Sequence, residues 1–292
     1  MDSQSLDNHQ TDELQHNLIY PTRTSELTLE QRVLRLRHIR QMRIVALGDS
    51  SVYGVGDFDD QSETVGAGWS GRFAHDVRAA RFVNLGKNGS RFRSVVKSQL
   101  DGALSMSPDI ALLCIGTNDV LRGDFSLQEI SDAAIHIIKK FSQAESLVVF
   151  LGIPDPIKTA PGPMALKKIL HRRVNALNWV LAEVCNQYGG VFIDTWDHSM
   201  ATDRSMWHID RMHPSAKGHQ EIADLVRRSL FLPRRSRKKL PVGRENINRR
   251  DEIFWLFTNG LKWFAKRSID LVPALLWLMV SSKFKDSQLE AR

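Results

Sequence analysis

Residues 43–50 read RIVALGDS, a short apolar run that ends in the triplet Gly48-Asp49-Ser50. Four later runs are similar, and longer stretches with helical spacing separate them. The runs are nearly continuous in apolar residues rather than alternating, which is typical of strands buried on both faces of a parallel sheet. The predicted strands are Arg43–Leu47, Arg81–Leu85, Ile110–Ile115, Leu147–Ile153 and Val191–Asp194.

The stretches between these runs predict helices. Two of them begin with a capping box, in which a Ser or Thr side chain and a Gln or Glu side chain three residues later each bind a backbone N–H. The boxes pair Thr28 with Gln31 and Ser126 with Glu129. The predicted helices are Thr28–Arg40, Trp69–Ala80, Ser94–Leu104, Ser126–Phe141, Pro163–Tyr188 and Ala216–Leu232. This alternation indicates a three-layer α/β/α domain around a central parallel sheet of about five strands, with its site at the carboxyl ends of the strands.

The 292 residues divide into four parts. Residues 1–41 are predicted to form a polar tail and a short helix, and residues 42–232 the α/β domain. Residues 233–250 are predicted to be a solvated basic linker, and residues 251–292 an amphipathic and apolar helical segment. Two cysteines, Cys114 and Cys185, are too few for a disulfide framework or a four-ligand zinc site. We expect both to be small buried hydrophobes.

The net charge of +7 is concentrated in the C-terminal part. Residues 233–267 hold 11 Lys and Arg against 3 Asp and Glu, a local charge of +8, and the rest of the chain carries −1. The nearly neutral domain gives no reason to expect nucleic acid at its main site. Residues 233–292 have two main interpretations: a helix pair packed on the domain, or a segment whose basic and aromatic residues contact an anionic membrane surface. Nucleic-acid binding by the linker is a third.

The sequence also bears on localisation. The N-terminus lacks the basic start and apolar core of a secretory signal. No run of 18 uncharged apolar residues occurs, so no ordinary membrane-spanning helix is expected. We therefore expect a cytoplasmic protein, peripheral on the inner membrane surface if residues 233–292 bind lipid. The sequence does not determine the oligomeric state.

Four short motifs follow four of the predicted strands. They are Gly48-Asp49-Ser50, Asn84-Leu85-Gly86-Lys87-Asn88-Gly89, Gly116-Thr117-Asn118-Asp119 and Asp210-Arg211-Met212-His213-Pro214. Each motif alone is common in loops. All four in this order resemble the SGNH, or GDSL, hydrolase family of serine esterases and lipases, over about residues 42–232. The resemblance implies the flavodoxin-like α/β/α fold of that family.

The resemblance also implies the site residues. Ser50 would be the nucleophile, which needs a base because a serine hydroxyl is weakly nucleophilic by itself. His213 would be that base, and Asp210 would orient the imidazole and stabilise its charged form. The oxyanion hole would comprise the backbone N–H groups of Ser50 and Gly89 and the side chain of Asn118. Within the second motif, Gly86 is the alternative to Gly89, and the family's spacing from Asn84 favours Gly89.

The function that these residues imply is that of a serine ester hydrolase working through an acyl-enzyme on Ser50. Its substrate would be a small-molecule or lipid-like acyl ester, and neither a metal nor an organic cofactor is implied. A metal site at His208 and His213 is disfavoured because no carboxylate or cysteine cluster completes it. Two alternatives stay open: an acyltransferase that uses the same site, and a non-enzymatic membrane-associated adaptor. The physiological substrate and its acyl chain length are not readable from the sequence.

Overall fold

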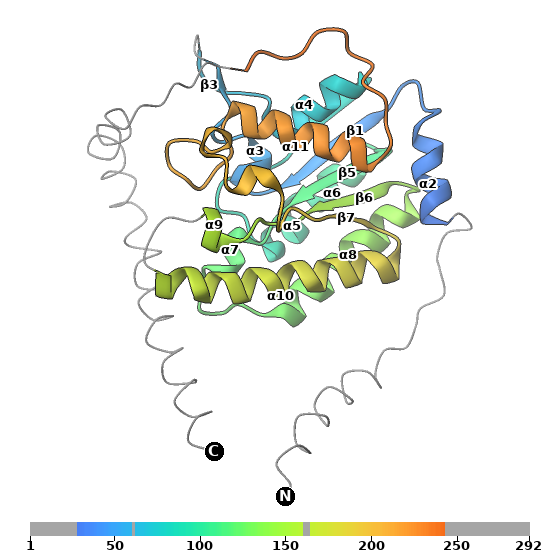
Figure 1. The fold of residues 1–292 in the computed structure, drawn as a ribbon. Coiled ribbons are helices and arrows are strands. Elements are labelled where there is room, and N and C mark those ends of the chain that lie inside the picture. Colours follow the sequence, from blue (N-terminus) through green and yellow to red (C-terminus); the bar gives the residue numbers. More distant parts are fainter. Residues whose placement is uncertain (1–27, 60–61, 160–163, 243–292) are drawn as a thin grey trace, which may run out of the picture.

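The computed structural model describes residues 28–59, 62–159 and 164–242. Five parallel strands form a central sheet in the order β4-β1-β5-β6-β7 (Figure 1). The strands are β1 (Arg43–Gly48), β4 (Arg81–Asn84), β5 (Ile110–Cys114), β6 (Leu147–Leu151) and β7 (Val191–Ile193). A separate antiparallel pair consists of β2 (Phe58–Asp59) and β3 (Ser62–Val65). The five predicted strands and their parallel arrangement are confirmed.

Helices cover both faces of the sheet, which makes the predicted three-layer architecture correct (Figure 1). One face carries α4 (Gly68–Val77) and α11 (Ala216–Ser229), and the other carries α5 (Phe92–Ser98), α8 (Leu127–Gln143) and α10 (Met164–Tyr188). Neighbouring strand residues alternate between the two cores: Val45 and Leu47 pack in one, and Ile44 and Ala46 in the other. Both faces of β1 are therefore apolar, which explains its continuous hydrophobic run. The shorter helices are α2 (Leu29–Leu36), α3 (Ser50–Tyr53), α6 (Leu100–Leu104), α7 (Thr117–Val120) and α9 (Pro156–Thr159), with 3₁₀ turns at Ser199–Ala201 and Arg204–Met206.

The prediction of one continuous helix over Ser94–Leu104 is wrong. The structure has two helices there, α5 and α6, and the helical conformation is interrupted between them at Gln99. The Gln99 side chain is buried, and its amide binds both the N–H and the C=O of Gly48 at the end of β1. This polar contact has no counterpart in a helical hydrophobic pattern, which is why the sequence did not predict the break.

One predicted capping box is confirmed and the other is half formed. Thr28 and Gln31 make both reciprocal bonds. Ser126 accepts a hydrogen bond from the backbone N–H of Glu129 at 3.2 Å. The Glu129 carboxylate instead accepts two hydrogen bonds from Arg93, each 2.7 Å long. A charge-assisted, two-point pair of this kind competes well with a single backbone N–H.

Part of the predicted basic linker lies on the domain. The structure describes its residues 233–242, and Arg234 there binds the carboxylates of Asp76 and Asp224, at 2.5 and 2.6 Å. The buried guanidinium of Arg72 also donates to the carbonyl of Pro241 at 2.9 Å. Residues 1–27, residues 243–250 of the linker and the predicted segment 251–292 lie outside the described residues.

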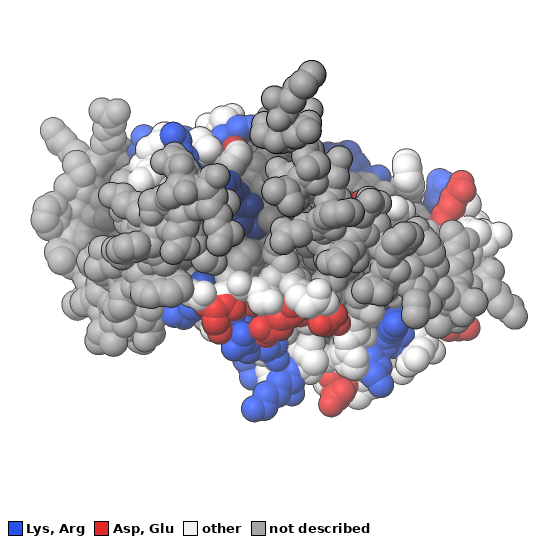
Figure 2. Space-filling model, turned by 90° about the horizontal axis from the view of Figure 1, so that it is seen from below, with Lys and Arg blue, Asp and Glu red and all other residues white. Residues whose placement is uncertain are grey.

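The surface of the described part of the chain carries charges of both signs. On the face shown in Figure 2, acidic and basic side chains lie interspersed. Both cysteines are buried as expected, and burial raises the pKa of the Cys185 thiol to about 12. Across the three described ranges, no helix combines the length and apolar character that crossing a bilayer requires.

Candidate active site

Ser50 lies at the carboxyl end of β1, where the chain turns sharply into α3. Gly48 makes the turn with φ +146°, and a Cβ atom there would lie 2.1 Å from the carbonyl oxygen of Cys114. Asp49 caps the new helix, because its Oδ1 accepts a hydrogen bond from the N–H of Ser51 at 3.0 Å. Ser50 is therefore the first residue of a short helix at the edge of the sheet. Asp49 therefore supports the turn through its side chain.

His213 approaches Ser50 from the loop before α11. Its Nε2 lies 2.8 Å from Ser50 Oγ, although 163 residues separate the two in sequence. Its Nδ1 lies 2.7 Å from Asp210 Oδ2. The other oxygen of Asp210 accepts the backbone N–H groups of Met212 and His213, at 2.9 and 3.0 Å. The carboxylate thus fixes the loop as well as the imidazole.

The charge state of Asp210 determines the tautomer of His213. Burial raises the pKa of Asp210, but hydrogen bonds from His208 and His213 outweigh burial and hold this pKa well below its usual range. An ionised carboxylate can only accept hydrogen bonds, so His213 carries its proton on Nδ1 when neutral. The lone pair of Nε2 then faces the hydroxyl of Ser50.

His208 contributes to this site in a way that the sequence did not suggest. Its Nδ1 lies 3.4 Å from Asp210 Oδ2, so the carboxylate lies between two imidazoles. The backbone N–H of His208 also donates to the carbonyl of His213 at 2.9 Å, which closes the loop. Sequence reasoning considered His208 only as a metal ligand. Among the described residues, no group of three or more His, Cys, Asp and Glu side chains is arranged to hold a metal ion.

Gly89 and Gly86 have different surroundings. The N–H of Gly86 donates to Asn84 Oδ1 at 2.9 Å, and a Cβ atom at Gly86 would lie 2.8 Å from the backbone nitrogen of Tyr53. Gly89 has φ +79°, and a Cβ atom there would meet no atom within 4 Å. Gly86 is thus packed with its donor engaged, whereas Gly89 faces open space.

Asn118 is held beside the Gly89 loop by its own side chain. Its Nδ2 donates to the carbonyl of Ser90 at 3.1 Å, which engages one of its two N–H groups. The neighbouring Asp119 is buried and joins α7 to the start of α5, because it accepts hydrogen bonds from Arg91 Nε and from the N–H of Phe92. Burial raises the pKa of Asp119. Asp119 therefore links the start of α5 to α7.

A buried polar cluster that joins α4 and α11 to the segment after α3 was not predicted from the sequence. Arg72 binds both carboxylate oxygens of Asp57, at 2.6 and 2.8 Å, and Asp57 also accepts the N–H of Gly68. His219 Nδ1 accepts the N–H of Trp69 at 3.0 Å, and its Nε2 donates to the carbonyl of Val55 at 3.0 Å. Burial lowers the pKa of His219 to about 4. Polar residues on an amphipathic helix are normally assigned to the exposed face, so the pattern gave no signal for them.

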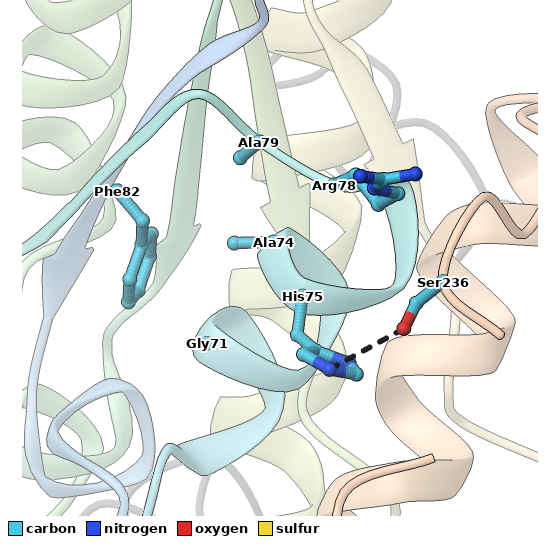
Figure 3. Close-up of a pocket in the computed structure, with 7 residues that line it drawn as sticks. All are labelled: Gly71, Ala74, His75, Arg78, Ala79, Phe82 and Ser236. Atoms are coloured by element: carbon cyan, nitrogen blue, oxygen red, sulfur yellow. Dashed lines mark hydrogen bonds between the residues drawn. The ribbon is translucent and has the colours of Figure 1, made fainter. Parts of the chain in front are cut away.

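Neither Trp69 nor the surface pocket between α4 and β4 contributes to the contacts among Ser50, His213 and Asp210. The Trp69 side chain is fully buried and belongs to the hydrophobic core. The pocket, of about 460 Å³, lies between α4, β4 and Ser236 (Figure 3). Its polar wall includes a 3.3 Å contact between Ser236 Oγ and His75 Nε2. The pocket adjoins the end of α4 that leads into β4, at the amino edge of the sheet, whereas Ser50 is at the carboxyl edge.

Comparisons with known proteins agree with this fold. The sequence model of the GDSL-like Lipase/Acylhydrolase family matches residues 46–221. Among solved structures, a catalytic mutant of an acetylxylan esterase from Geobacillus stearothermophilus is 18% identical with a TM-score of 0.52, over 67% of this chain and 97% of that one. A lipase/acylhydrolase from Enterococcus faecalis is 19% identical with a TM-score of 0.52, over 67% of this chain and 100% of that one. An α/β hydrolase from the metagenome of Lake Arreo, Spain, is 17% identical with a TM-score of 0.51, over 65% of this chain and 95% of that one. No curated protein matches the sequence.

The three-layer α/β/α fold and the family match define an enzyme that hydrolyses ester bonds. The family match covers more than half of the chain, so the chain belongs to the GDSL-like Lipase/Acylhydrolase family. The family predicted from the motifs is therefore confirmed. The solved structures, at these low identities, establish the fold alone.

Proposed function

We propose that the protein hydrolyses acyl esters through an acyl-enzyme on Ser50, with His213 as base and Asp210 as the orienting carboxylate. The observation that carries this proposal is the unbroken chain of contacts from Ser50 Oγ to His213 Nε2 and from His213 Nδ1 to Asp210, at 2.8 and 2.7 Å. Both distances suit proton transfer along the chain. Membership of the family favours this enzyme over the non-enzymatic adaptor.

The first half-reaction acylates the serine. Ser50 Oγ bonds to the carbonyl carbon of the ester as its proton passes to His213 Nε2, and the electron pair of the C=O bond moves onto oxygen. The resulting imidazolium is stabilised by the Asp210 carboxylate. When the oxyanion collapses, the C–O bond to the alcohol breaks, and His213 returns the proton to that alcohol. Water then repeats the sequence on the acyl-enzyme and releases the carboxylic acid.

In this proposal, three donors bind the oxyanion. The N–H of Ser50 is the first N–H of a helix, which no bond within that helix engages. The backbone N–H of Gly89 suits the second donor position better than that of Gly86, because the N–H of Gly86 already donates to Asn84. The second N–H of the Asn118 amide supplies the third. Fixed donors of this kind need no rearrangement as charge develops in the transition state.

The test compares the wild type with Ser50→Ala on p-nitrophenyl esters of graded acyl length. Hydrolysis should fall to background in the variant, and a fluorophosphonate should label Ser50 in the wild type. Labelling of a different serine, or equal rates for both proteins, would refute the proposal. The chain-length series also reports the reach of the acyl pocket, and added alcohols show whether acyl transfer competes with hydrolysis.

We also propose that residues 233–292 contact an anionic membrane surface. Within the described part, the exposed basic residues of this segment are Arg237, Lys238 and Lys239. Arg234 is paired with Asp76 and Asp224, and the half-buried Arg235 binds backbone carbonyls of the domain. Cosedimentation of the full chain with phosphatidylserine vesicles and with phosphatidylcholine vesicles tests this. Binding should require the anionic lipid and weaken when the three residues are changed to Glu. Equal binding to both vesicle types would count against it.

A further inference from the structure

The break between α5 and α6 places a buried amide against the nucleophile turn. Gln99 is 1% exposed, and its Oε1 accepts the N–H of Gly48 at 2.9 Å. Its Nε2 donates to the carbonyl of Gly48 at 3.1 Å and to Ser90 Oγ at 3.2 Å. A single carboxamide thus uses its oxygen and both N–H groups, which satisfies most of its hydrogen-bonding capacity.

These contacts join the three segments that carry the oxyanion donors. Gly48 is two residues before Ser50, and Ser90 directly follows Gly89. The carbonyl of Ser90 in turn accepts the hydrogen bond that orients Asn118. The carbonyl of Gly48 also accepts the N–H of Lys87 from the Gly89 loop, at 3.1 Å. The end of β1, the Gly89 loop and the Asn118 side chain are therefore linked through one side chain.

We propose that Gln99 is a positioning residue that fixes the relative placement of the Ser50, Gly89 and Asn118 donors. This inference rests on the proposed function of Ser50. Gln99 touches none of the reacting atoms, so its effect is exerted through the backbone of Gly48 and through Ser90. Donors held in advance act only on the transition state, and a misplacement of about 1 Å can lower the rate about 10²-fold.

The chain offers a matched control in Asn178 on α10. The Asn178 amide makes the same two-point contact with a backbone, accepting the N–H of Ile153 at 3.0 Å and donating to its carbonyl at 2.8 Å. Asn178 is also buried, at 6% exposure, and its partner Ile153 lies just after the end of β6, whereas Gly48 ends β1. Loss of either amide leaves one buried backbone N–H unpaired, although the carbonyl of Gly48 keeps its hydrogen bond from the N–H of Lys87. Only Gln99 is joined to the oxyanion donors.

The experiment compares Gln99→Met with Asn178→Leu, two changes that keep the approximate side-chain volume. Both should lower Tm, whereas only Gln99→Met should lower kcat and kcat/KM together, by about 10- to 100-fold. Equal kcat losses in the two variants would overturn the inference. If Gln99→Met does not fold, Ser90→Ala replaces it, because it removes one link of the same network. A kcat for Ser90→Ala equal to that of the wild type would then overturn the inference.

A second variant separates positioning from general packing. In Gln99→Glu, a protonated carboxyl can accept from the N–H of Gly48 and donate to its carbonyl, whereas an ionised one cannot donate. Burial raises the pKa of a carboxyl group, so the protonated fraction of the introduced carboxyl should increase as the pH falls from 8 to 6. The ratio of variant kcat to wild-type kcat should therefore rise between pH 8 and pH 6, and a constant ratio would contradict the proposed role. If Ser50→Ala retains activity, the proposed function fails; if only the Gln99 results fail, the proposed function stands.

Discussion

The buried imidazole of His219 should make the fold sensitive to acid. His219 is completely buried, receives the N–H of Trp69 on Nδ1 and donates from Nε2 to the carbonyl of Val55. These bonds require the neutral ring, because a charged ring has no lone pair for Trp69. Burial lowers the pKa of His219 to about 4 from its ordinary value of 6.5.

The sign of the effect follows from proton binding in the two states. Between pH 6.5 and pH 4 the unfolded chain takes up a proton at His219 and the folded chain does not. The stabilisation that His219 contributes is complete above pH 6.5 and is lost as the pH falls toward 4. A pKa of about 4 against 6.5 corresponds to about 3 kcal/mol of unfolding free energy over this window.

Urea unfolding of the wild type and of His219→Gln, followed by circular dichroism at steps from pH 8 to pH 4, measures this contribution. Glutamine cannot titrate, and its amide retains a donor for Val55. The variant should be less stable than the wild type at pH 8, and the difference should shrink or reverse by about 3 kcal/mol toward pH 4. Taking the difference removes all titrations that the two proteins share. Two parallel stability curves would refute the assignment of a neutral buried ring.

Further predictions concern both stability and catalysis. Burial raises the pKa of Asp49 to about 6 from 3.8, so between pH 4 and pH 6 the unfolded chain releases this proton while the folded chain keeps it. The wild type should therefore lose about 3 kcal/mol of stability as the pH rises through this window, and Asp49→Asn should lack this loss in the same urea series. Asp210→Asn should lower kcat about 10⁴-fold because the amide favours the wrong tautomer of His213, and a kcat within tenfold of the wild type in ester assays would contradict this. Asn118→Ala should lower kcat about 10²- to 10³-fold with little change in KM, measured on the same esters. Arg72→Met leaves a buried carboxylate at Asp57 unpaired and should lower the free energy of unfolding by about 3–5 kcal/mol; a loss below about 1 kcal/mol would show that solvent reaches the carboxylate.

Two contacts of the candidate active site have no counterpart in the sequence pattern. His208 touches Asp210, and Gln99 touches Gly48 across 51 residues of sequence. Neither contact produces a periodic pattern, because a single polar side chain in a loop or at a helix break leaves the surrounding hydrophobic spacing unchanged. The same holds for Arg234, which reads as part of a charged linker but binds the carboxylates of Asp76 and Asp224.

The sequence by itself determined the class of the fold and the motifs of the site. Strands buried on both faces leave continuous apolar runs, and turns such as Gly48-Asp49-Ser50 are local, so both are visible in one dimension. Only the tertiary structure decided which polar groups meet: Ser50 with His213, and Gln99 with the Gly48-Asp49-Ser50 turn. The physical reason is that packing of helices against the sheet sets these pairings, and the partners are contributed by segments far apart in the chain.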